Sequence, residues 1–308
     1  MGFSQSIIRG FNTQQTPLWE MRSYNNDPLK VRYYTFQNGL TLITSNQKTS
    51  PRVYTMIAVR TGSKNDPATN TGLAHYLEHM LFKGTDKYGS LDWKKEEPLL
   101  KQIDGLYELY NHTTDPAKRK SIYHAIDSIS QAAAKFAIAN EYDKMCQALG
   151  AEGTNAFTSN DETVYINDIP SNMVSKWLSL EAERFRNPIL RLFHTELEAV
   201  YEEKNISLDR DGDKVYEKLF AELFKDHNYG LQTTIGTVEH LKNPSLEAIR
   251  NYYNEYYVPN NMAIIMSGDF DPDAVAAEVP WVRARVKPAD ALEKSSRSRP
   301  SPPSRVSL

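Results

Sequence analysis

Apolar and polar residues alternate near the start of the chain in a way that predicts paired strands. Alternation over residues 31–35 runs into the turn pair Asn38-Gly39, and residues 40–44 return in the opposite direction. A β-branched apolar run at residues 53–59 is typical of a central strand. The chain therefore begins its folded part, from about residue 28, as a sheet.

A short buried helix is predicted after the loop at residues 60–71, which is rich in Gly, Asn, Asp and Pro. We expect this helix to begin near Gly72 with Thr71 as its N-cap. Apolar residues surround it on almost every side: Leu73, Ala74, Tyr76, Leu77, Met80 and Leu81. Such a helix belongs in the core.

The remaining pattern mixes helices with a few further strands. Residues 94–149 have the periodicity of a long polar-faced helical hairpin, interrupted at 112–116. Strands are expected at 155–158, 163–167 and 262–267, and helices at 171–185, 192–208, 214–224 and 245–256. This order predicts an α+β fold, a mainly antiparallel sheet with helices packed on one face.

Composition narrows the class of protein. The 308 residues carry 36 Lys and Arg against 39 Asp and Glu, a net charge of −3, which gives no general field for nucleic acid. No apolar run reaches the length of a membrane span. The single cysteine, Cys146, excludes a disulfide framework and an all-cysteine zinc site, so any metal needs His and carboxylate ligands.

The two ends are expected to lie outside the folded domain at residues 28–282. Residues 1–27 form a polar N-terminal extension without the apolar core of a secretory signal, although residues 1–6 fit an N-myristoylation pattern. Residues 283–308 form a Ser/Arg/Pro-rich tail that cannot bury apolar surface and should be disordered. The helical hairpin at 94–149 is interpreted as an insert within the domain.

The sequence His75-Tyr76-Leu77-Glu78-His79 is the first candidate for chemistry. Two histidines four residues apart lie on one face of a helix, where both rings can reach one tetrahedral zinc ion. Glu78 is placed to contact a metal-bound water rather than the metal. The alternative is a pair of hydrogen-bonded core histidines beside a buried carboxylate, but an unpaired buried Glu costs several kcal/mol.

A third ligand is expected from the acidic segment at residues 196–203. Glu196 and Glu203 are two helical turns apart and share a face with Leu192, Ala199 and Val200. We assign Glu203 as a ligand and Glu196 as the acceptor that orients a histidine. The alternative for this segment is an ordinary solvated acidic helix face, to which Glu198 and Glu202 belong.

Several ordered blocks resemble the pitrilysin, insulysin and mitochondrial processing peptidase family, over about residues 28–275. His-x-x-Glu-His is the inverted zincin motif, and its surroundings at residues 71–85 match this family closely. Further matching blocks lie at residues 58–63, 155–159, 163–165, 196–203, 257–262 and 268–270. The chain is thus similar to the N-terminal catalytic half of these zinc metallopeptidases.

The resemblance implies one zinc ion per chain, held by His75, His79 and Glu203, with Glu78 as general base and Glu196 in support. It also implies an edge strand that adds an extended peptide substrate by backbone hydrogen bonds. Its residues are Asn155, Ala156, Phe157 and Thr158. The implied function is a zinc metalloendopeptidase that cleaves peptides or small unfolded proteins, in a clamshell completed by a second homologous half.

Two alternatives remain open beside this enzyme. One is a non-catalytic peptide-binding or structural subunit on the same scaffold, and the other is an inactive zinc-binding half that lacks its partner. The compartment is also open: the resemblance suggests the bacterial periplasm or envelope, no export signal is visible in these residues, and the cytoplasm stays an alternative. The insert either gates the substrate or only decorates the surface.

Overall fold

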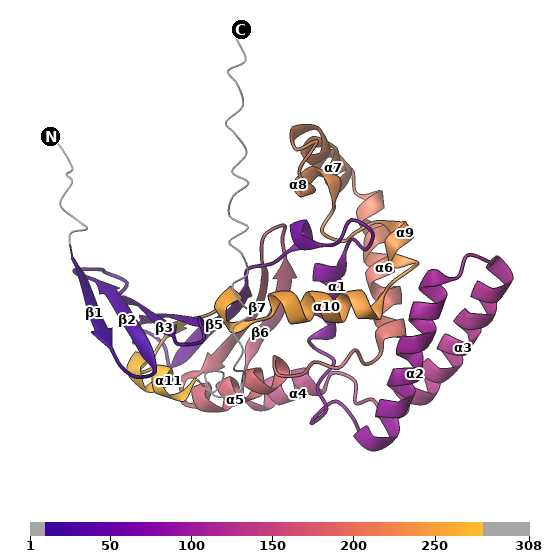
Figure 1. Ribbon diagram of the computed structural model, residues 1–308. Coiled ribbons are helices and arrows are strands. Elements are labelled where there is room, and N and C mark those ends of the chain that lie inside the picture. The colour runs from indigo at the N-terminus through magenta and orange to yellow at the C-terminus, as the bar shows by residue number, and fades with distance from the viewer. Residues whose placement is uncertain (1–9, 280–308) are drawn as a thin grey trace, which may run out of the picture.

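A single eight-stranded sheet organises the protein in the computed structural model, which describes residues 10–279 (Figure 1). The strand order across the sheet is β1-β2-β3-β4-β8-β5-β7-β6. The strands are β1 (Phe11–Gln15), β2 (Trp19–Tyr24), β3 (Val31–Phe36), β4 (Thr41–Asn46), β5 (Arg52–Val59), β6 (Glu152–Thr158), β7 (Thr163–Pro170) and β8 (Met262–Gly268). All neighbouring strands are antiparallel except β4 and β8, which confirms the predicted fold class.

The helices connect and cover these strands. They are α1 (Leu73–Met80), α2 (Trp93–His112), α3 (Pro116–Ala134), α4 (Glu141–Ala148), α5 (Val174–Arg184), α6 (Phe193–Asp209), α7 (Asp211–Leu223), α8 (Asn228–Leu231), α9 (Val238–Leu241), α10 (Leu246–Tyr256) and α11 (Pro272–Glu278). Short 3₁₀ turns lie at η1 (Ser63–Asn65), η2 (Ser171–Met173) and η3 (Pro259–Asn261). Within residues 10–279, no helix combines the length and the apolar character that a bilayer-spanning segment requires.

One face of the sheet carries the core. Along β5, Val53, Thr55, Ile57 and Val59 are buried, whereas Tyr54 on the other face is 44% exposed. The alternation follows from the two-residue period of a strand, because successive side chains point to opposite faces. The buried residues of β5 and β8 form one apolar cluster with those of α1, α5, α10 and α11. Helices therefore cover the face that carries the predicted apolar positions.

The sheet begins earlier than the sequence predicted. Residues 1–27 were expected to be an extension, but β1 and β2 continue the sheet beyond β3. Trp19 and Met21 are buried, and the Trp19 ring packs edge-on against Tyr34 at 5.0 Å. Only two apolar side chains anchor β2, so its alternation is hidden among polar residues. The myristoylation pattern and the tail at 283–308 lie outside the described residues.

The insert contains three helices, α2, α3 and α4, rather than a simple hairpin. A buried arginine ties it to the domain: Arg191 donates to both carboxylate oxygens of Glu96 on α2, at 2.6 and 3.0 Å. The same guanidinium donates to the backbone oxygens of Lys83, at 2.7 Å, and Thr85, at 3.1 Å. This contact joins the insert to the chain that leaves α1 and to the chain that enters α6.

Candidate metal centre

The helix that carries the histidines is capped by Asp66, a residue of the preceding loop. Gly72 adopts a left-handed conformation with φ of 88°, and its N–H donates to the carboxylate of Asp66 at 2.7 Å. The N–H of Ala74 donates to the other Asp66 oxygen at 3.0 Å. Asp66 therefore takes the role predicted for Thr71, whose hydroxyl lies 2.7 Å from His240 Nδ1 instead. Burial raises the pKa of Asp66 to about 7, despite these backbone hydrogen bonds.

His75 and His79 lie side by side on α1, one turn apart. Their Nε2 atoms are 3.2 Å apart, and the rings are nearly perpendicular, at 83°. Leu77 and Met80, on the other side of the helix, are fully buried in the core. The helix thus fixes both rings by packing its apolar face, as the four-residue spacing predicted.

Glu203 on α6 completes a triangle of possible ligand atoms. Its Oε2 lies 3.6 Å from His75 Nε2 and 3.8 Å from His79 Nε2. Ligands about 2.0–2.1 Å from a tetrahedral zinc ion are about 3.3–3.4 Å from each other. The three donors therefore fit a zinc ion after small side-chain adjustments, and the arrangement leaves a fourth position open. Among the residues that the structure describes, this is the only group of three such side chains close enough to share a metal.

The two histidines differ in their electrostatic surroundings. Burial, and then the neighbouring charge of His79, lower the pKa of His75 to about 4, so its ring is neutral at pH 7. Burial also lowers the pKa of His79, but the hydrogen bond to Glu196 and the charge of Glu203 outweigh it, and the net shift is upward. A histidine binds a metal ion as the neutral imidazole, so metal binding at His79 competes with protonation of the ring.

Glu196 holds one of the two rings in place. His79 Nδ1 donates to Glu196 Oε1 at 2.8 Å, so Nε2 is the nitrogen that faces His75 and Glu203. The second Glu196 oxygen lies 2.5 Å from Lys83 Nζ. Burial raises the pKa of Glu196, but the hydrogen bonds from His79 and Lys83 lower it by a larger amount. The net shift is downward, so this carboxylate is ionised. His75 Nδ1, by contrast, is buried without a hydrogen-bond partner among residues 10–279.

Lys83 was not predicted as part of the site. Its only sequence signal is its position four residues after His79, one turn beyond the motif. The other expectations for α6 hold in part: Glu198 and Glu202 are exposed, and Val200 is fully buried. Ala199, which was expected on the buried face, is exposed.

Glu78 lies beside the two histidines and contacts the sheet. Its side chain accepts a hydrogen bond of 2.5 Å from the hydroxyl of Thr158, the last residue of β6. Burial raises the pKa of Glu78, although the Thr158 hydrogen bond and the charge of His79 act in the opposite direction. A raised pKa makes the ionised carboxylate a stronger proton acceptor.

An open cavity of about 470 Å³ joins the metal centre to β6. His75, Glu78 and Glu203 line this cavity together with residues 156–158 of β6. β6 is the last strand of the sheet, and no other described strand pairs with its outer edge. Phe157 is 42% exposed, and Asn155 is exposed on the same edge without lining the cavity. The four predicted substrate-binding residues thus follow a free strand edge beside the metal centre.

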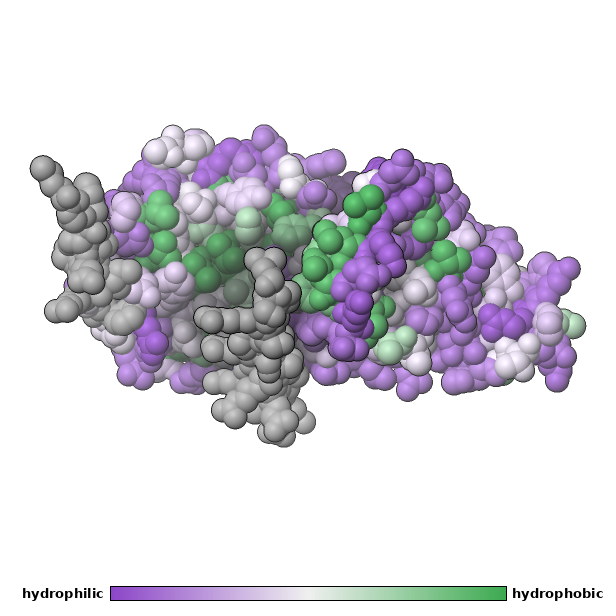
Figure 2. All heavy atoms as spheres, turned by 90° about the horizontal axis from the view of Figure 1, so that it is seen from above, coloured by the Kyte–Doolittle hydropathy of each residue, from purple (hydrophilic) through white to green (hydrophobic). Residues whose placement is uncertain are grey.

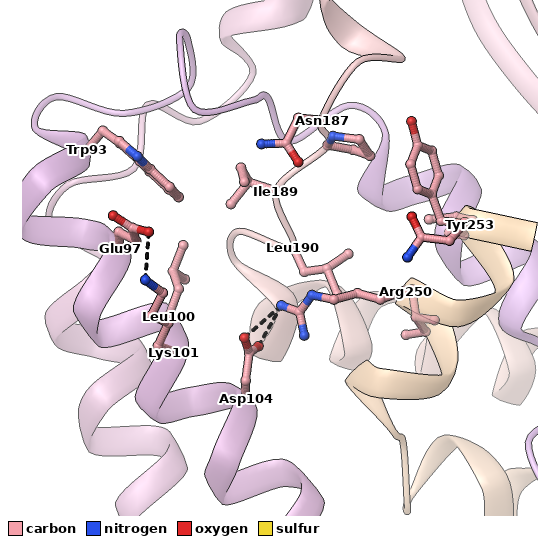
Figure 3. Close-up of a pocket in the computed structure, with 14 residues that line it drawn as sticks. Trp93, Glu97, Leu100, Lys101, Asp104, Asn187, Ile189, Leu190, Arg250 and Tyr253 are labelled. Atoms are coloured by element: carbon pink, nitrogen blue, oxygen red, sulfur yellow. Dashed lines mark hydrogen bonds and ion pairs between the residues drawn. The ribbon is translucent and has the colours of Figure 1, made fainter. Parts of the chain in front are cut away.

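A second cavity, of about 350 Å³, lies between α2, α10 and the chain before α6 (Figure 3). Its charged residues form pairs: Arg250 contacts Asp104 at 2.7 Å, and Lys101 contacts Glu97 at 2.8 Å (Figure 3). Leu77, on the side of α1 that faces the core, forms part of its lining. No histidine or cysteine lines it, so it offers no alternative metal centre.

Comparison with known families gives two matches. Residues 41–98 match a family model described as Insulinase (Peptidase family M16), which includes α1 and its histidines. Residues 244–284 match a model described as Peptidase M16 inactive domain. The first match therefore contains His75, Glu78 and His79 but not Glu203.

Similar curated proteins cover most of this chain. It is 24% identical over 253 residues to the "Uncharacterized zinc protease YmxG" of Bacillus subtilis, covering 82% of the chain and 49% of the relative. It is 23% identical over 268 residues to the "Mitochondrial-processing peptidase subunit beta" of Dictyostelium discoideum, covering 86% of the chain and 46% of that subunit. The chain spans about half the length of these relatives.

Solved structures share the fold. A protease from Helicobacter pylori superposes with a TM-score of 0.64 at 23% identity, over 85% of this chain and 52% of that one. The first half of the periplasmic protease PqqL from Escherichia coli superposes with a TM-score of 0.60 at 18% identity, over 83% and 46% of the two chains. The fold in Figure 1 is therefore shared with about half of each of these two solved chains.

Proposed function

The chain belongs to the insulinase family of peptidases (family M16), and on that basis we propose that it is a zinc-dependent metalloendopeptidase acting on peptides or small unfolded proteins. The convergence of His75, His79 and Glu203 beside Glu78 carries this proposal. A structural zinc site is closed by four protein ligands, whereas three ligands with an open position are typical of a catalytic site.

Each residue of the site has a defined task in this function. A zinc ion held by the three ligands would act as a Lewis acid and lower the pKa of its bound water towards 7. Glu78 takes a proton from the attacking water and passes it to the amine of the leaving peptide. Thr158 keeps the Glu78 carboxylate turned towards β6, and Glu196 fixes the tautomer of His79.

Substrate binding is assigned to the outer edge of β6. An extended peptide adds to a free strand edge through main-chain hydrogen bonds, and the neighbouring side chains select among sequences. Residues 155–158 supply this edge, and the cavity of about 470 Å³ brings residues 156–158 next to Glu78. A peptide bound there would pass the metal centre with its backbone extended.

Full activity is proposed to need a second homologous half. The chain spans only about half the length of these relatives, and the metal centre here lies in an open cavity rather than an enclosed chamber. An alternative function, peptide binding without catalysis, is favoured by the match of residues 244–284 to the inactive-domain model. The ligands and Glu78 lie outside that matched segment.

The test combines zinc stoichiometry with cleavage of a quenched fluorescent peptide, for the chain alone and with the second half of a relative. We expect about one zinc per chain in the wild type and in Glu78→Gln, with cleavage lost only in the variant. Glu202→Gln, an exposed carboxylate on α6, is the matched control and should cleave normally. Cleavage retained in Glu78→Gln would refute the assigned base, and zinc without cleavage in every mixture would favour the binding subunit.

A further inference from the structure

Helix α7 presents an apolar stripe to solvent. Val215, Leu219 and Leu223 follow one another at four-residue intervals, and their exposed fractions are 68%, 50% and 63%. Not one residue of this 13-residue helix is buried. A surface helix normally turns such a stripe towards the core, so the outward direction here requires an explanation.

Aromatic residues on the flank next to the stripe, about 100° around the helix, connect α7 to the rest of the fold, although Tyr216 is itself 55% exposed. Tyr216, Phe220 and Phe224 form a ladder of rings with centroids 4.3 and 5.4 Å apart. Phe224 in turn packs edge-on against Tyr229 at 5.4 Å, which joins α7 to α8. The aliphatic stripe is therefore not the side by which the helix is held in the fold.

The stripe belongs to a larger apolar surface. Leu231 is 63% exposed and Leu208, at the end of α6, is 42% exposed. Ile206 is 51% exposed but lines the open cavity at the metal centre, so it belongs to that site rather than to this surface. The view from above shows apolar residues at the surface in the region of α7 and α8 (Figure 2). Exposed apolar side chains that lie close together on a surface are typical of interaction sites.

Charge argues against an anionic membrane as the partner of this surface. α7 carries four acidic residues and two lysines: Asp211, Asp213, Glu217, Glu222, Lys214 and Lys218. Helices that lie on membranes are rich in Lys and Arg on their polar face. The surface is therefore better suited to another protein.

We propose that this surface is a dimerisation interface, in which α7 packs antiparallel against α7 of a second copy of the chain across a two-fold axis at Leu219. In this arrangement Leu219 meets its own counterpart, and Val215 of one copy meets Leu223 of the other, because both are four residues from the axis. An isologous contact requires such a self-complementary pattern. Val215, Leu219 and Leu223 have this self-complementary spacing, and no polar residue stands among these three positions.

Charges beside the stripe fit the same symmetry. Lys218 and Glu222 lie on one flank of the stripe, with side chains 75% and 53% exposed, and they form an ion pair of 2.8 Å within the helix. In an antiparallel pair like flanks adjoin, so Lys218 of one copy lies about 3 Å along the axis from Glu222 of the other. Two symmetric ion pairs can then bracket the apolar contact. The interface does not depend on the proposed peptidase activity.

Analytical ultracentrifugation tests the proposal directly. A contact built mainly on one helix pair is smaller than a standard interface, so we expect a dissociation constant on the order of micromolar. Leu219→Lys should weaken dimerisation at least tenfold. Leu109→Lys, on α2 with a wild-type exposed fraction of 53%, is the matched control and should dimerise normally. Equal thermal unfolding of the two variants checks that both are folded.

Two further experiments fix the register. Lys218→Glu and Glu222→Lys should each weaken the dimer, and the double variant should restore it, because each ion pair is re-formed with reversed signs. Leu219→Cys should form an intermolecular disulfide under copper–phenanthroline oxidation, since facing Cα atoms of helices 8–10 Å apart come within disulfide range. Leu91→Cys, at a residue 70% exposed, is the control, and the native Cys146 is buried.

The opposite results would overturn the proposal. A wild type that stays monomeric up to about 100 μM, well above the expected dissociation constant, would show that the stripe does not bind a second copy. A dimer that survives Leu219→Lys would place the contact elsewhere on the molecule. No disulfide from Leu219→Cys in a dimeric protein would refute the antiparallel register centred on this residue.

Discussion

The hydroxyl of Thr158 donates a hydrogen bond of 2.5 Å to the carboxylate of Glu78 and so links the edge strand β6 to the helix that carries both histidines. Thr158 lies 80 residues after Glu78 in the chain. The strand proposed to bind the substrate thereby also positions the proposed base. A peptide that pairs with β6 would stabilise the strand end that holds Glu78.

Removing this hydroxyl tests the link. Thr158→Val keeps the shape of the side chain but leaves Glu78 without its donor, and a hydrogen bond to a charged group contributes about 1.5–3 kcal/mol. We expect kcat to fall about tenfold or more, with zinc content unchanged. Thr158→Ser retains the hydroxyl and should keep most of the activity. Equal losses in the two variants would contradict the hydrogen bond and point to packing by the methyl group.

Lys83 and Glu196 should control metal affinity. Lys83 binds one oxygen of Glu196 and leaves the other for His79 Nδ1, so the ring orientation depends on both. Loss of such outer partners typically costs 10–100-fold in metal affinity. We therefore expect weaker zinc binding in Glu196→Gln and, to a lesser degree, in Lys83→Met.

Competition with a chromophoric chelator measures these affinities without any substrate. Lys87→Met is the matched control, because Lys87 is 63% exposed and pairs with Glu183, away from the metal centre. Unchanged zinc affinity in Glu196→Gln would remove this carboxylate from the site. If zinc affinity fell in Glu196→Gln but was unchanged in Lys83→Met, Glu196 would orient His79 without a contribution from Lys83.

The local part of this site could be predicted from the sequence in full, and the long-range part only in part. His75 and His79 are neighbours on one helix, so their spacing fixes their geometry. Glu203 comes from a helix 124 residues after His79, and its assignment rests on the shared face of Glu196 and Glu203, supported by the family resemblance. Lys83 acts through a tertiary contact with Glu196, and Asp66 caps α1 from six residues before Gly72 through a loop conformation, neither of which periodicity encodes.

The same distinction applies to the fold. The strong β-branched pattern of residues 53–59 correctly predicted β5 as a central strand, since burial on the sheet leaves a clear signal. β1 and β2 at the far edge bury few apolar groups, and the sequence there looks like an extension. The roles of the ligands, of Glu78 and of β6 stay predictions until they are tested.

Asp66 should make stability depend on pH. Burial raises its pKa from 3.8 to about 7 in the folded protein, so between these values the folded state binds a proton that the unfolded state has lost. The stabilising contribution of the protonated form is therefore full below about pH 4 and is lost as the pH rises to about 7. The slope is about 1.4 kcal/mol per pH unit.

Urea unfolding of the wild type and of Asp66→Asn at several pH values measures this effect. The asparagine cannot titrate, so the free energy of unfolding of the variant should rise relative to that of the wild type by this slope between about pH 5 and about pH 7. Above about pH 7 the difference between the two should stay constant. Asp92→Asn, an exposed N-cap on α2, is the control and should show no such trend. A constant difference between wild type and Asp66→Asn would mean that Asp66 is ionised throughout.

Zinc removal should destabilise the protein through Glu203. The three ligands come from α1 and α6, so a bound ion would add a link between two helices that already meet through apolar contacts and the His79–Glu196 and Tyr76–Phe193 hydrogen bonds. A ligand that binds only the folded state stabilises it by about 2.7 kcal/mol at a free concentration 100 times its dissociation constant. We expect the melting temperature of the wild type to fall on chelation by several degrees.

In Glu203→Ala the zinc-dependent difference in melting temperature should shrink, because two imidazoles alone hold the ion weakly. The exposed neighbour variant Glu202→Ala should keep the full difference. Calorimetry of the apo and zinc-loaded forms of each variant would measure this, and an equal zinc-dependent shift in Glu203→Ala and the wild type would exclude Glu203 as a ligand.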